Sequence, residues 1–237
     1  MLTAPLNVFS HHPAQMRTQY DSDTLAALTL QIYERGLHEW QPLVASKRPD
    51  SDAAAPRYHL VSGHRRHMAR LFAFALRDWA LDRPDEEVSL ETAVSLVKSF
   101  IEASTRLPEA ITALLEKYGT EEVNFVLFEG GEKDEILALQ AANYGGELPD
   151  MLGVAHSFHQ AAEAGAAVKE IARNSGQSEQ YVRNHLALHS IPPLLAEHIA
   201  AGDLPLSVAR TVADLPDPKR AGLSIFILTH SLGILLT

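Results

Sequence analysis

The segment 168–188 contains residues whose types and spacing are those of a helix-turn-helix. Ala172 provides the small side chain needed where the first helix meets the second, and Gly176 accepts a positive φ at the turn. Val182 follows six positions later and can anchor the second helix, while Ile171 and Leu186 complete a shared apolar core. This order of residues predicts two helices joined by a glycine turn.

The second helix of this segment is predicted to present polar side chains to the major groove of DNA. Ser178 is a good N-cap, which leaves the first turn of the helix exposed. Gln and Asn amides can pair with adenine edges, and Arg can pair with guanine or phosphate. The side chains expected to contact DNA are Gln177, Ser178, Gln180, Arg183 and Asn184. The alternative is a plain helical hairpin, in which these residues form an ordinary solvated face.

A second group of residues, near position 63, could bind phosphate. Gly63 ends a predicted strand, and Arg65 and Arg66 follow at the start of a predicted helix. Backbone N–H groups, the helix dipole and guanidinium groups all favour an anion there. The alternative is an ordinary helix whose basic first turn is solvated.

Histidines and carboxylates are the candidate metal ligands of a chain without cysteine. Histidine pairs three or four positions apart occur on predicted helices, at His64 and His67, at His156 and His159, and at His185 and His189. No third ligand lies near any pair in the sequence, so a specific metal site is not favoured. The carboxylates between positions 121 and 135, which a metal-dependent nuclease would need, show no distinctive spacing and are interpreted as solvated faces.

The composition limits the class of protein. The chain has 237 residues, 46% of them hydrophobic, which is enough for two modest domains with their own cores. It has no cysteine, which excludes disulfides and thiol catalysis and suits a reducing compartment. No secretory signal is visible, and the apolar run at 223–236 is too short to span a bilayer, so a cytoplasmic protein is expected. That run could instead form a terminal helix or lie at a subunit interface.

The net charge of −10 is unevenly distributed along the chain. Residues 80–150 hold five basic and sixteen acidic groups, a net charge of −11, which leaves both ends of the chain near neutral. Phosphate neutralisation needs Lys and Arg, so a monomer of this charge should bind DNA modestly. The avidity of a homodimer would supply the remaining affinity.

The periodicity predicts a small α+β domain followed by an all-α domain. Helices are expected from position 21 to a stop at Gly36 and at 64–79, 89–103, 108–118 and 132–142, with strands at 42–45, 57–62 and 122–128. Five further helices are expected at 150–164, 168–175, 178–188, 193–201 and 207–214. The turn-rich stretch at 143–150 places the domains at 1–146 and 147–237. The acidic helical pair at 86–118 is interpreted as a solvated insertion packed on the first domain rather than a partner or dimer surface.

Several segments resemble, in the same order, motifs of the ParB family of chromosome and plasmid partition proteins. Residues 15–21 resemble Q-x-R-x-x-F-D, and 36–44, with Gln41 and Pro42, resemble G-x-x-Q-P-L-x-V. Residues 58–69 resemble Y-x-L-I-x-G-E-R-R-x-x-A, residues 135–143 resemble the helix that leads into E-N-x-Q-R, and 188–192 resemble L-x-x-L-P. The resemblance covers about residues 14–85 and 120–216. It implies a ParB/sulfiredoxin-like first domain and a ParB-type helix-turn-helix domain.

The resemblance also implies that the first domain binds CTP with magnesium and closes a dimer as a clamp on DNA. The matching positions are Gln41, Gly63, His64, Arg65, Arg66 and Asn143. This sequence departs from the family pattern in three places: two extra residues lie within 37–40, His64 replaces a glutamate, and residues 142–146 keep only Asn143 of E-N-x-Q-R. Magnesium prefers carboxylate oxygens to a single amide. We therefore expect weak CTP binding with little magnesium dependence, and at most residual CTP hydrolysis.

Three functions remain open at this point. The favoured one is DNA partition as a homodimer, for which a ParA-type ATPase would be a partner. The second is a dimeric transcription regulator whose first domain is only a scaffold; the absence of Lys and Arg from residues 1–16 mildly favours it over partition. The third is a ParB-like metal-dependent nuclease. Sulfiredoxin chemistry is excluded because it needs a cysteine nucleophile.

Overall fold

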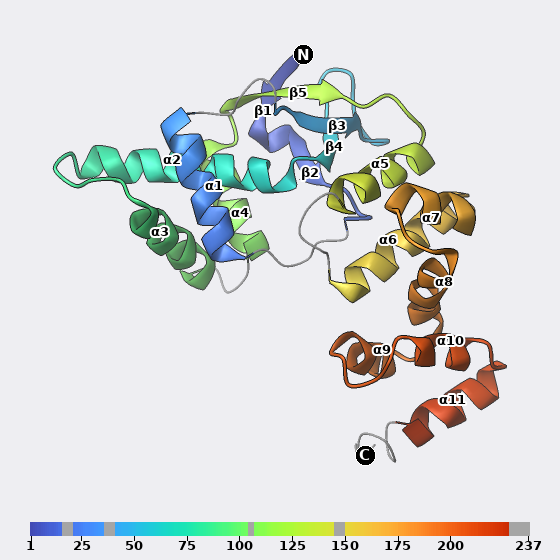
Figure 1. Cartoon of the computed structure of the whole chain (residues 1–237). Helices are drawn as coiled ribbons and strands as arrows, with labels where there is room; N and C mark the ends of the chain where they lie inside the picture. The colour runs from blue at the N-terminus through green and yellow to red at the C-terminus, as the bar shows by residue number, and fades with distance from the viewer. Residues whose placement is uncertain (16–20, 36–40, 104–106, 145–149, 228–237) are drawn as a thin grey trace. The chain divides into compact units, whose positions relative to one another are not determined.

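A five-stranded mixed sheet organises the N-terminal part of the computed structural model, which describes residues 1–15, 21–35, 41–103, 107–144 and 150–227 (Figure 1). Its strands are β1 (Leu2–Pro5), β2 (Phe9–His11), β3 (Leu43–Lys47), β4 (Tyr58–Ser62) and β5 (Glu122–Leu127), in the spatial order β1-β5-β3-β4-β2. β1 pairs antiparallel with β5 and β3 with β4, whereas β3 pairs parallel with β5 and β2 with β4. A short 3-10 helix, η1 (Leu6–Val8), joins β1 to β2.

The alternation of apolar and polar residues along β5 shows that one face of the sheet is covered. Val123 and Phe125 are buried, while Glu122, Asn124 and Val126 between and beside them are exposed. The Phe125 ring packs edge-on against Phe9 of β2, with ring centroids 5.2 Å apart. This aromatic contact therefore connects β5 with the edge strand β2 on the buried face of the sheet.

Four helices supply the rest of this core: α1 (Ser22–Arg35), α2 (His64–Asp82), α3 (Leu90–Ala103) and α4 (Leu107–Tyr118). α2 is the most deeply buried, and Leu71, Phe72 and Leu76 have no exposed surface. The acidic pair α3 and α4 is packed into the same core, where Val97 and Leu114 are fully buried or nearly so. The apolar faces of these two helices are thus part of the domain, and their charges lie on the outside.

The C-terminal part of the chain is entirely helical. Its elements are α5 (Glu132–Tyr144), α6 (Met151–Glu163), α7 (Val168–Ser175), α8 (Glu179–Ala187), η2 (Leu188–Ser190), α9 (Pro193–Ala200), α10 (Ser207–Ala213) and α11 (Asp217–Phe226). One core joins α5, α6, α7 and α8 around the fully buried Phe158. A second core joins η2, α9 and α10 around Leu195 and Ile199. The fold class is an α+β domain followed by an all-α helix-turn-helix region, as the sequence predicts.

The contacts divide the chain into two compact units, one made of residues 1–12 and 20–130 and the other of 13–19 and 131–237. α5 belongs to the helical unit because Ile136 and Leu137 are buried against Val154 and Ile171. The sequence places the domain boundary after residue 146 instead, because it follows the turn signals rather than the apolar face of α5. None of the helices among the described residues is long and apolar enough to cross a membrane.

Three features of the chain differ from the sequence prediction or lie beyond it. β1 and β2 were not predicted, because strands of four and three residues are too short to show alternation, and β1 contains Pro5. The predicted helix stop at Gly36 lies outside the described residues. Within the predicted terminal segment 223–236, α11 extends to Phe226, and the residues from 228 onward are likewise not described.

Replacing Phe125 with Ala should destabilise the first unit by about 3–5 kcal/mol, because it removes a large side chain from the centre of the sheet. Val126→Ala is the matched control, since Val126 is adjacent on the same strand and 42% exposed. Its cost should stay below about 1 kcal/mol. Urea unfolding followed by tryptophan fluorescence measures both changes. Equal costs for the two variants would contradict the assigned faces of β5.

Candidate nucleic-acid interface

The turn between α7 and α8 is left-handed and lies at Gly176. Its φ is +68° and its ψ is 20°, a backbone conformation that residues other than glycine rarely adopt. The N–H groups of Gly176 and Gln177 both donate to the carbonyl of Ala172, the second at 3.0 Å. The last turn of α7 is thereby closed, and three residues, 176–178, connect α7 to α8.

Buried side chains on both sides of the turn fix the orientation of α8. Ile171 and Val182 have no exposed surface, and Ala172 is 5% exposed. Phe158 of α6 packs edge-on against the Tyr181 ring at a centroid distance of 6.3 Å. The predicted shared core is therefore present, and α8 has one buried face and one outward face.

Ser178 caps the start of α8, because its Oγ accepts a hydrogen bond from the Tyr181 N–H at 3.1 Å. Gln177, directly before it, is half-buried. The carboxylate of Glu179 follows in the first turn and accepts from Arg183 Nη2 at 2.6 Å. The first turn of α8 is thus ordered and open to solvent, with an ion pair along it.

A chain of hydrogen bonds connects the remaining predicted contact residues. Gln180 Nε2 donates to Asn184 Oδ1 at 2.6 Å, and Arg210 Nη1 of α10 donates to Gln180 Oε1 at 2.7 Å. Arg210 could not be predicted as part of this site from the sequence, because it lies 26 residues beyond Asn184 on a helix with no recognised motif. Only the packing of α10 against α8 reveals it.

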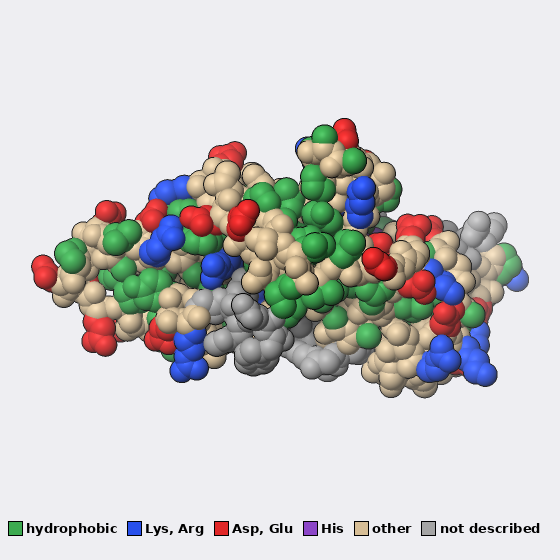
Figure 2. Space-filling view, turned by 90° about the horizontal axis from the view of Figure 1, so that it is seen from above, with side chains coloured by type: hydrophobic (Ala, Val, Ile, Leu, Met, Phe, Trp, Pro, Cys, Tyr) green, Lys and Arg blue, Asp and Glu red, His purple; other side chains and the backbone are tan. Residues whose placement is uncertain are grey.

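The charges on α8 and α10 are mixed, since Arg183 pairs with Glu179 and Arg210 lies near Asp214. In the face shown in Figure 2, acidic and basic side chains are interspersed rather than gathered into one basic field. On α7, Lys169 and Arg173 are exposed. DNA binding by this unit would therefore depend on a few local cations rather than on a broad positive potential.

The second predicted site begins at Gly63, which is also left-handed, with φ +95°. A Cβ atom on Gly63 would come within 2.7 Å of Leu43 Cδ2, so both conformation and space require glycine here. Gly63 is the N-cap of α2 and makes no side-chain cap, which leaves N–H groups of the first helical turn available to a ligand. Arg66 Nη1 donates to the backbone carbonyl of Gln41 at 2.5 Å, so the structure brings these two predicted residues together.

The His64 side chain is buried and uncharged, unlike a side chain that binds phosphate or magnesium. Its side chain is 7% exposed, and its ring lies 4.9 Å from that of His11. Burial lowers the pKa of His64 well below its usual value, so the imidazole is neutral near pH 7. It offers neither a positive charge to a phosphate nor a carboxylate to magnesium. The residues at this turn fit an anion, but they do not fit a magnesium ion.

Asn143, the remaining predicted nucleotide residue, lies in α5 of the helical unit. Its Nδ2 donates to Gln15 Oε1 and to the carbonyl of Leu139, both at 2.9 Å. These contacts give the side chain a structural role within its own unit. Positions 145 and 146, where the family motif would continue, lie outside the described residues.

A family model described as the ParB HTH domain matches residues 150–232 of this chain. Residues 150–232 therefore match a ParB-type helix-turn-helix domain. The chain is 24% identical over 220 residues to the chromosome-partitioning protein Spo0J of Thermus thermophilus, an alignment that covers 92% of this chain and 62% of that protein. The chain thus spans about three fifths of the length of this curated relative.

Two solved structures of Caulobacter crescentus ParB, truncated at the C-terminus, are similar to this chain. The first, a complex with the centromeric parS site, has a TM-score of 0.48 and 17% identity and covers 99% of this chain and 94% of its own. The second, a complex with CTP-γ-S, has a TM-score of 0.36 and 20% identity, with 96% and 98% coverage. Because both TM-scores are below 0.5, neither likeness establishes a shared fold or ligand.

The histidine pairs of the chain lie in different surroundings. His159 and His189 stack with their ring centroids 4.4 Å apart, whereas His185 packs at 4.0 Å on the Tyr181 ring. His67 is buried, with Nε2 3.0 Å from the carbonyl of Leu6. Among the residues that the structure describes, no three His, Asp or Glu side chains are arranged to hold a metal ion.

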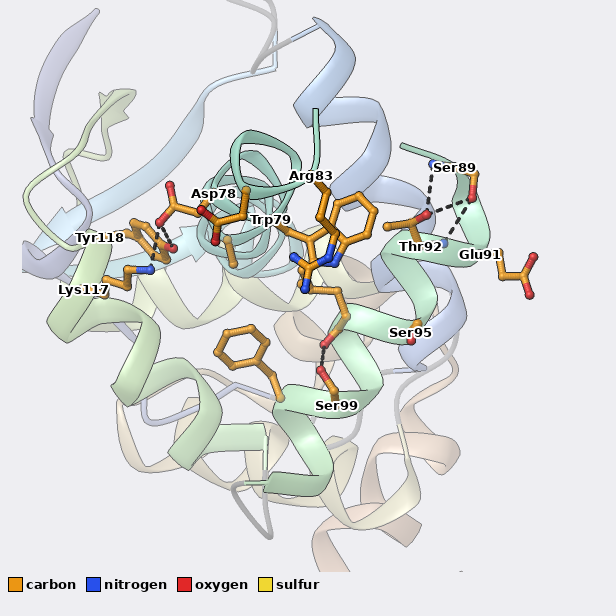
Figure 3. A pocket seen from close by; sticks show the side chains of 14 residues that line it. Asp78, Trp79, Arg83, Ser89, Glu91, Thr92, Ser95, Ser99, Lys117 and Tyr118 are labelled. Atoms are coloured by element: carbon orange, nitrogen blue, oxygen red, sulfur yellow. Dashed lines mark hydrogen bonds and ion pairs between the residues drawn. The ribbon is translucent and has the colours of Figure 1, made fainter. Parts of the chain in front are cut away.

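A polar cavity of about 560 Å³ lies between α2, α3 and α4 and was not predicted (Figure 3). Asp78 accepts from Tyr118 Oη at 2.6 Å and from Lys117 Nζ at 2.8 Å, and Arg83 lies over the Trp79 ring at 5.0 Å. Ser95 and Ser99 line the opposite wall on α3. Its cationic side chains thus already contact a carboxylate or an aromatic ring of the wall, which gives no indication of a particular ligand.

Replacing Gly176 with Val should destabilise the helical unit by about 1–2 kcal/mol, because a β-branched residue is forced to a positive φ. Gly176→Asn should cost less, since Asn tolerates this conformation. Gly222→Ala in α11 is the control, because an added Cβ meets nothing within 4 Å at either glycine. That variant should be as stable as the parent or more so. Urea unfolding followed by circular dichroism decides the question, and an unaltered Gly176→Val curve would show that the turn lies elsewhere.

Proposed function

We propose that this chain binds double-stranded DNA through α8 and acts as a ParB-like partition protein. The observation that carries the proposal is the outward face of α8, whose polar side chains follow an ordered left-handed turn within the matched ParB helix-turn-helix domain. A helix held in this way can enter the major groove with its first turns. Gln177, Ser178, Gln180, Arg183 and Asn184 are the proposed contact residues.

The charge of the chain favours binding as a homodimer. The net charge is −10, and the exposed cations of α7 and α8 are few. Two linked recognition helices raise the effective concentration of the second contact once the first has formed. We therefore propose that two copies bind a two-fold symmetric site and that neither copy alone binds tightly at physiological salt.

Two other functions, transcription regulation and DNA cleavage, can be distinguished from partition by simple assays. A partition protein should stimulate a ParA-type ATPase, whereas a transcription regulator should repress or activate a promoter without one. The neutral, buried His64 at the Gly63 turn favours the regulator, because a scaffold domain needs no bound nucleotide. A nuclease would cleave DNA in a magnesium-dependent reaction.

Replacing Arg183 or Asn184 with Ala should each weaken specific DNA binding by about 1–3 kcal/mol, as expected for loss of one good base contact. The target is first obtained by selecting bound sequences from a random DNA pool, and affinities are then measured at fixed salt. Arg48→Ala is the matched control, because Arg48 also forms an ion pair with a carboxylate at 2.6 Å but lies in the first unit. Wild-type affinity in both test variants would show that α8 is not the recognition helix.

We further propose that the Gly63 turn binds the phosphates of CTP weakly. Support comes from the uncapped start of α2, the adjacent Arg65 and the strict requirement for glycine. Arg66 is already hydrogen-bonded to the carbonyl of Gln41, and burial keeps His64 neutral, so two of the motif side chains add little to phosphate affinity. Asn143 is the residue of the third family motif that the sequence keeps, and its side chain is hydrogen-bonded within the helical unit.

Calorimetric titration should therefore give weak CTP binding that changes little when magnesium is removed, with negligible hydrolysis. Arg65→Ala should reduce that affinity about tenfold, since it removes a charge-assisted contact to phosphate. Arg57→Ala, a nearby exposed arginine outside the turn, is the control. Tight, magnesium-dependent binding with turnover would show that carboxylates outside the family motif bind the metal. Absence of binding would favour the scaffold role of the first unit.

A further inference from the structure

The hydrogen bonds on α8 fix which way its amide side chains face. Arg210 can only donate, so the atom of Gln180 that it contacts at 2.7 Å must be the carbonyl oxygen. The NH2 group of Gln180 is then directed to Asn184 Oδ1, at 2.6 Å. Asn184 in turn is left with its NH2 group directed away from this contact. One arginine therefore sets the orientation of two successive amides.

The backbone that holds Arg210 is well anchored. Its neighbours on α10, Ala209 and Val212, have no exposed surface. The guanidinium is also held from its own helix, because Arg210 Nε lies 3.7 Å from Asp214 Oδ2. Arg210 thus reaches α8 from a fixed position on a neighbouring helix, and a guanidinium cannot reverse its polarity by turning over.

This arrangement has a consequence for base recognition. An asparagine recognises adenine by accepting from the N6 amino group and donating to N7, which requires its carbonyl oxygen. Oδ1 of Asn184 already uses one of its two lone pairs to accept from Gln180. This contact directs the oxygen toward Gln180 and leaves one lone pair for N6, which disfavours the bidentate contact with adenine. Guanine presents two acceptors, N7 and O6, in the major groove. The NH2 groups of Asn184 and Gln180 are donors and match guanine.

We infer that Arg210 is a positioning residue that makes α8 select guanine rather than adenine opposite Asn184. The inference rests on the proposed DNA-binding function and replaces the adenine contact that residue types alone suggest. Arg210 acts through Gln180 and needs no DNA contact of its own for this effect.

The test starts from the sequence that the wild-type protein selects from random DNA. The position at which Asn184→Ala loses its base preference marks the contact of Asn184. We expect guanine at this position, favoured over adenine by about tenfold, which corresponds to one good base contact. Arg210→Met keeps the length of the side chain and removes its donors, and it should reduce this ratio to less than about threefold.

Two further variants separate positioning from other effects. Gln180→Glu still accepts from Arg210 but cannot donate to Asn184, so Asn184 becomes free to turn and adenine should be accepted. Arg183→Met removes an arginine from the same helix that pairs with Glu179 rather than with the amides. It should lower the affinity for the selected site while leaving the ratio of guanine to adenine at the Asn184 position unchanged.

A measurement without DNA tests the contacts themselves. The side-chain NH2 resonances of Gln180 and Asn184 should both shift in the NMR spectrum of Arg210→Met and stay in place in Arg183→Met. A wild-type site with adenine at the Asn184 position, or an unchanged ratio in Arg210→Met, would overturn this inference while leaving DNA binding intact. A protein that selects no DNA sequence would instead overturn the proposed function, and with it the selection of guanine.

Discussion

The left-handed turn at Gly176 determines where α8 can point, and the rest of the proposed interface depends on it. The N–H groups of Gly176 and Gln177 both donate to the carbonyl of Ala172, and these two hydrogen bonds fix the direction in which the chain leaves α7. Ile171 and Val182 then meet on the inner side of the turn and are excluded from water. Burying side chains of this size contributes about 1.5–3 kcal/mol each, more than the strain that glycine avoids. The outward direction of Gln180, Arg183 and Asn184 follows from that burial.

A glycine turn of the same hand precedes α2, but the chemistry around it is different. At Gly176 the turn closes a helix and places the next one, whereas at Gly63 it opens a helix and exposes its first N–H groups. The close approach of Leu43 leaves no room for a side chain. The shape of a phosphate-binding turn is therefore retained, while His64 has become part of the buried core. At this turn Gly63, Arg65 and Arg66 match the family pattern, whereas the neutral His64 stands where the pattern has a glutamate.

Most of the fold could be predicted from the sequence where the periodicity was long. α2, α6 and α7 lie within a few residues of their predicted ranges, and the glycine turn lies at its predicted position. β1 and β2 could not be predicted, because a strand of three or four residues has no measurable period. α5 belongs to the helical unit because its apolar face packs in the core of that unit. The sequence of α5 shows that it has an apolar face, but not which of the two cores that face joins. Arg210 could not be predicted either, because its contact with Gln180 joins two helices that are far apart in the sequence.

The edges of the sheet limit how copies of this protein can associate. β1 and β2 occupy the two edges of the five-stranded sheet. β1 has four residues and ends at Pro5, which has no N–H to donate, and β2 has only three residues. Edges this short give a second chain few backbone groups to pair with, so the sheet is poorly suited to grow by strand addition. A second copy would therefore have to associate through helices or loops rather than by extending this open sheet.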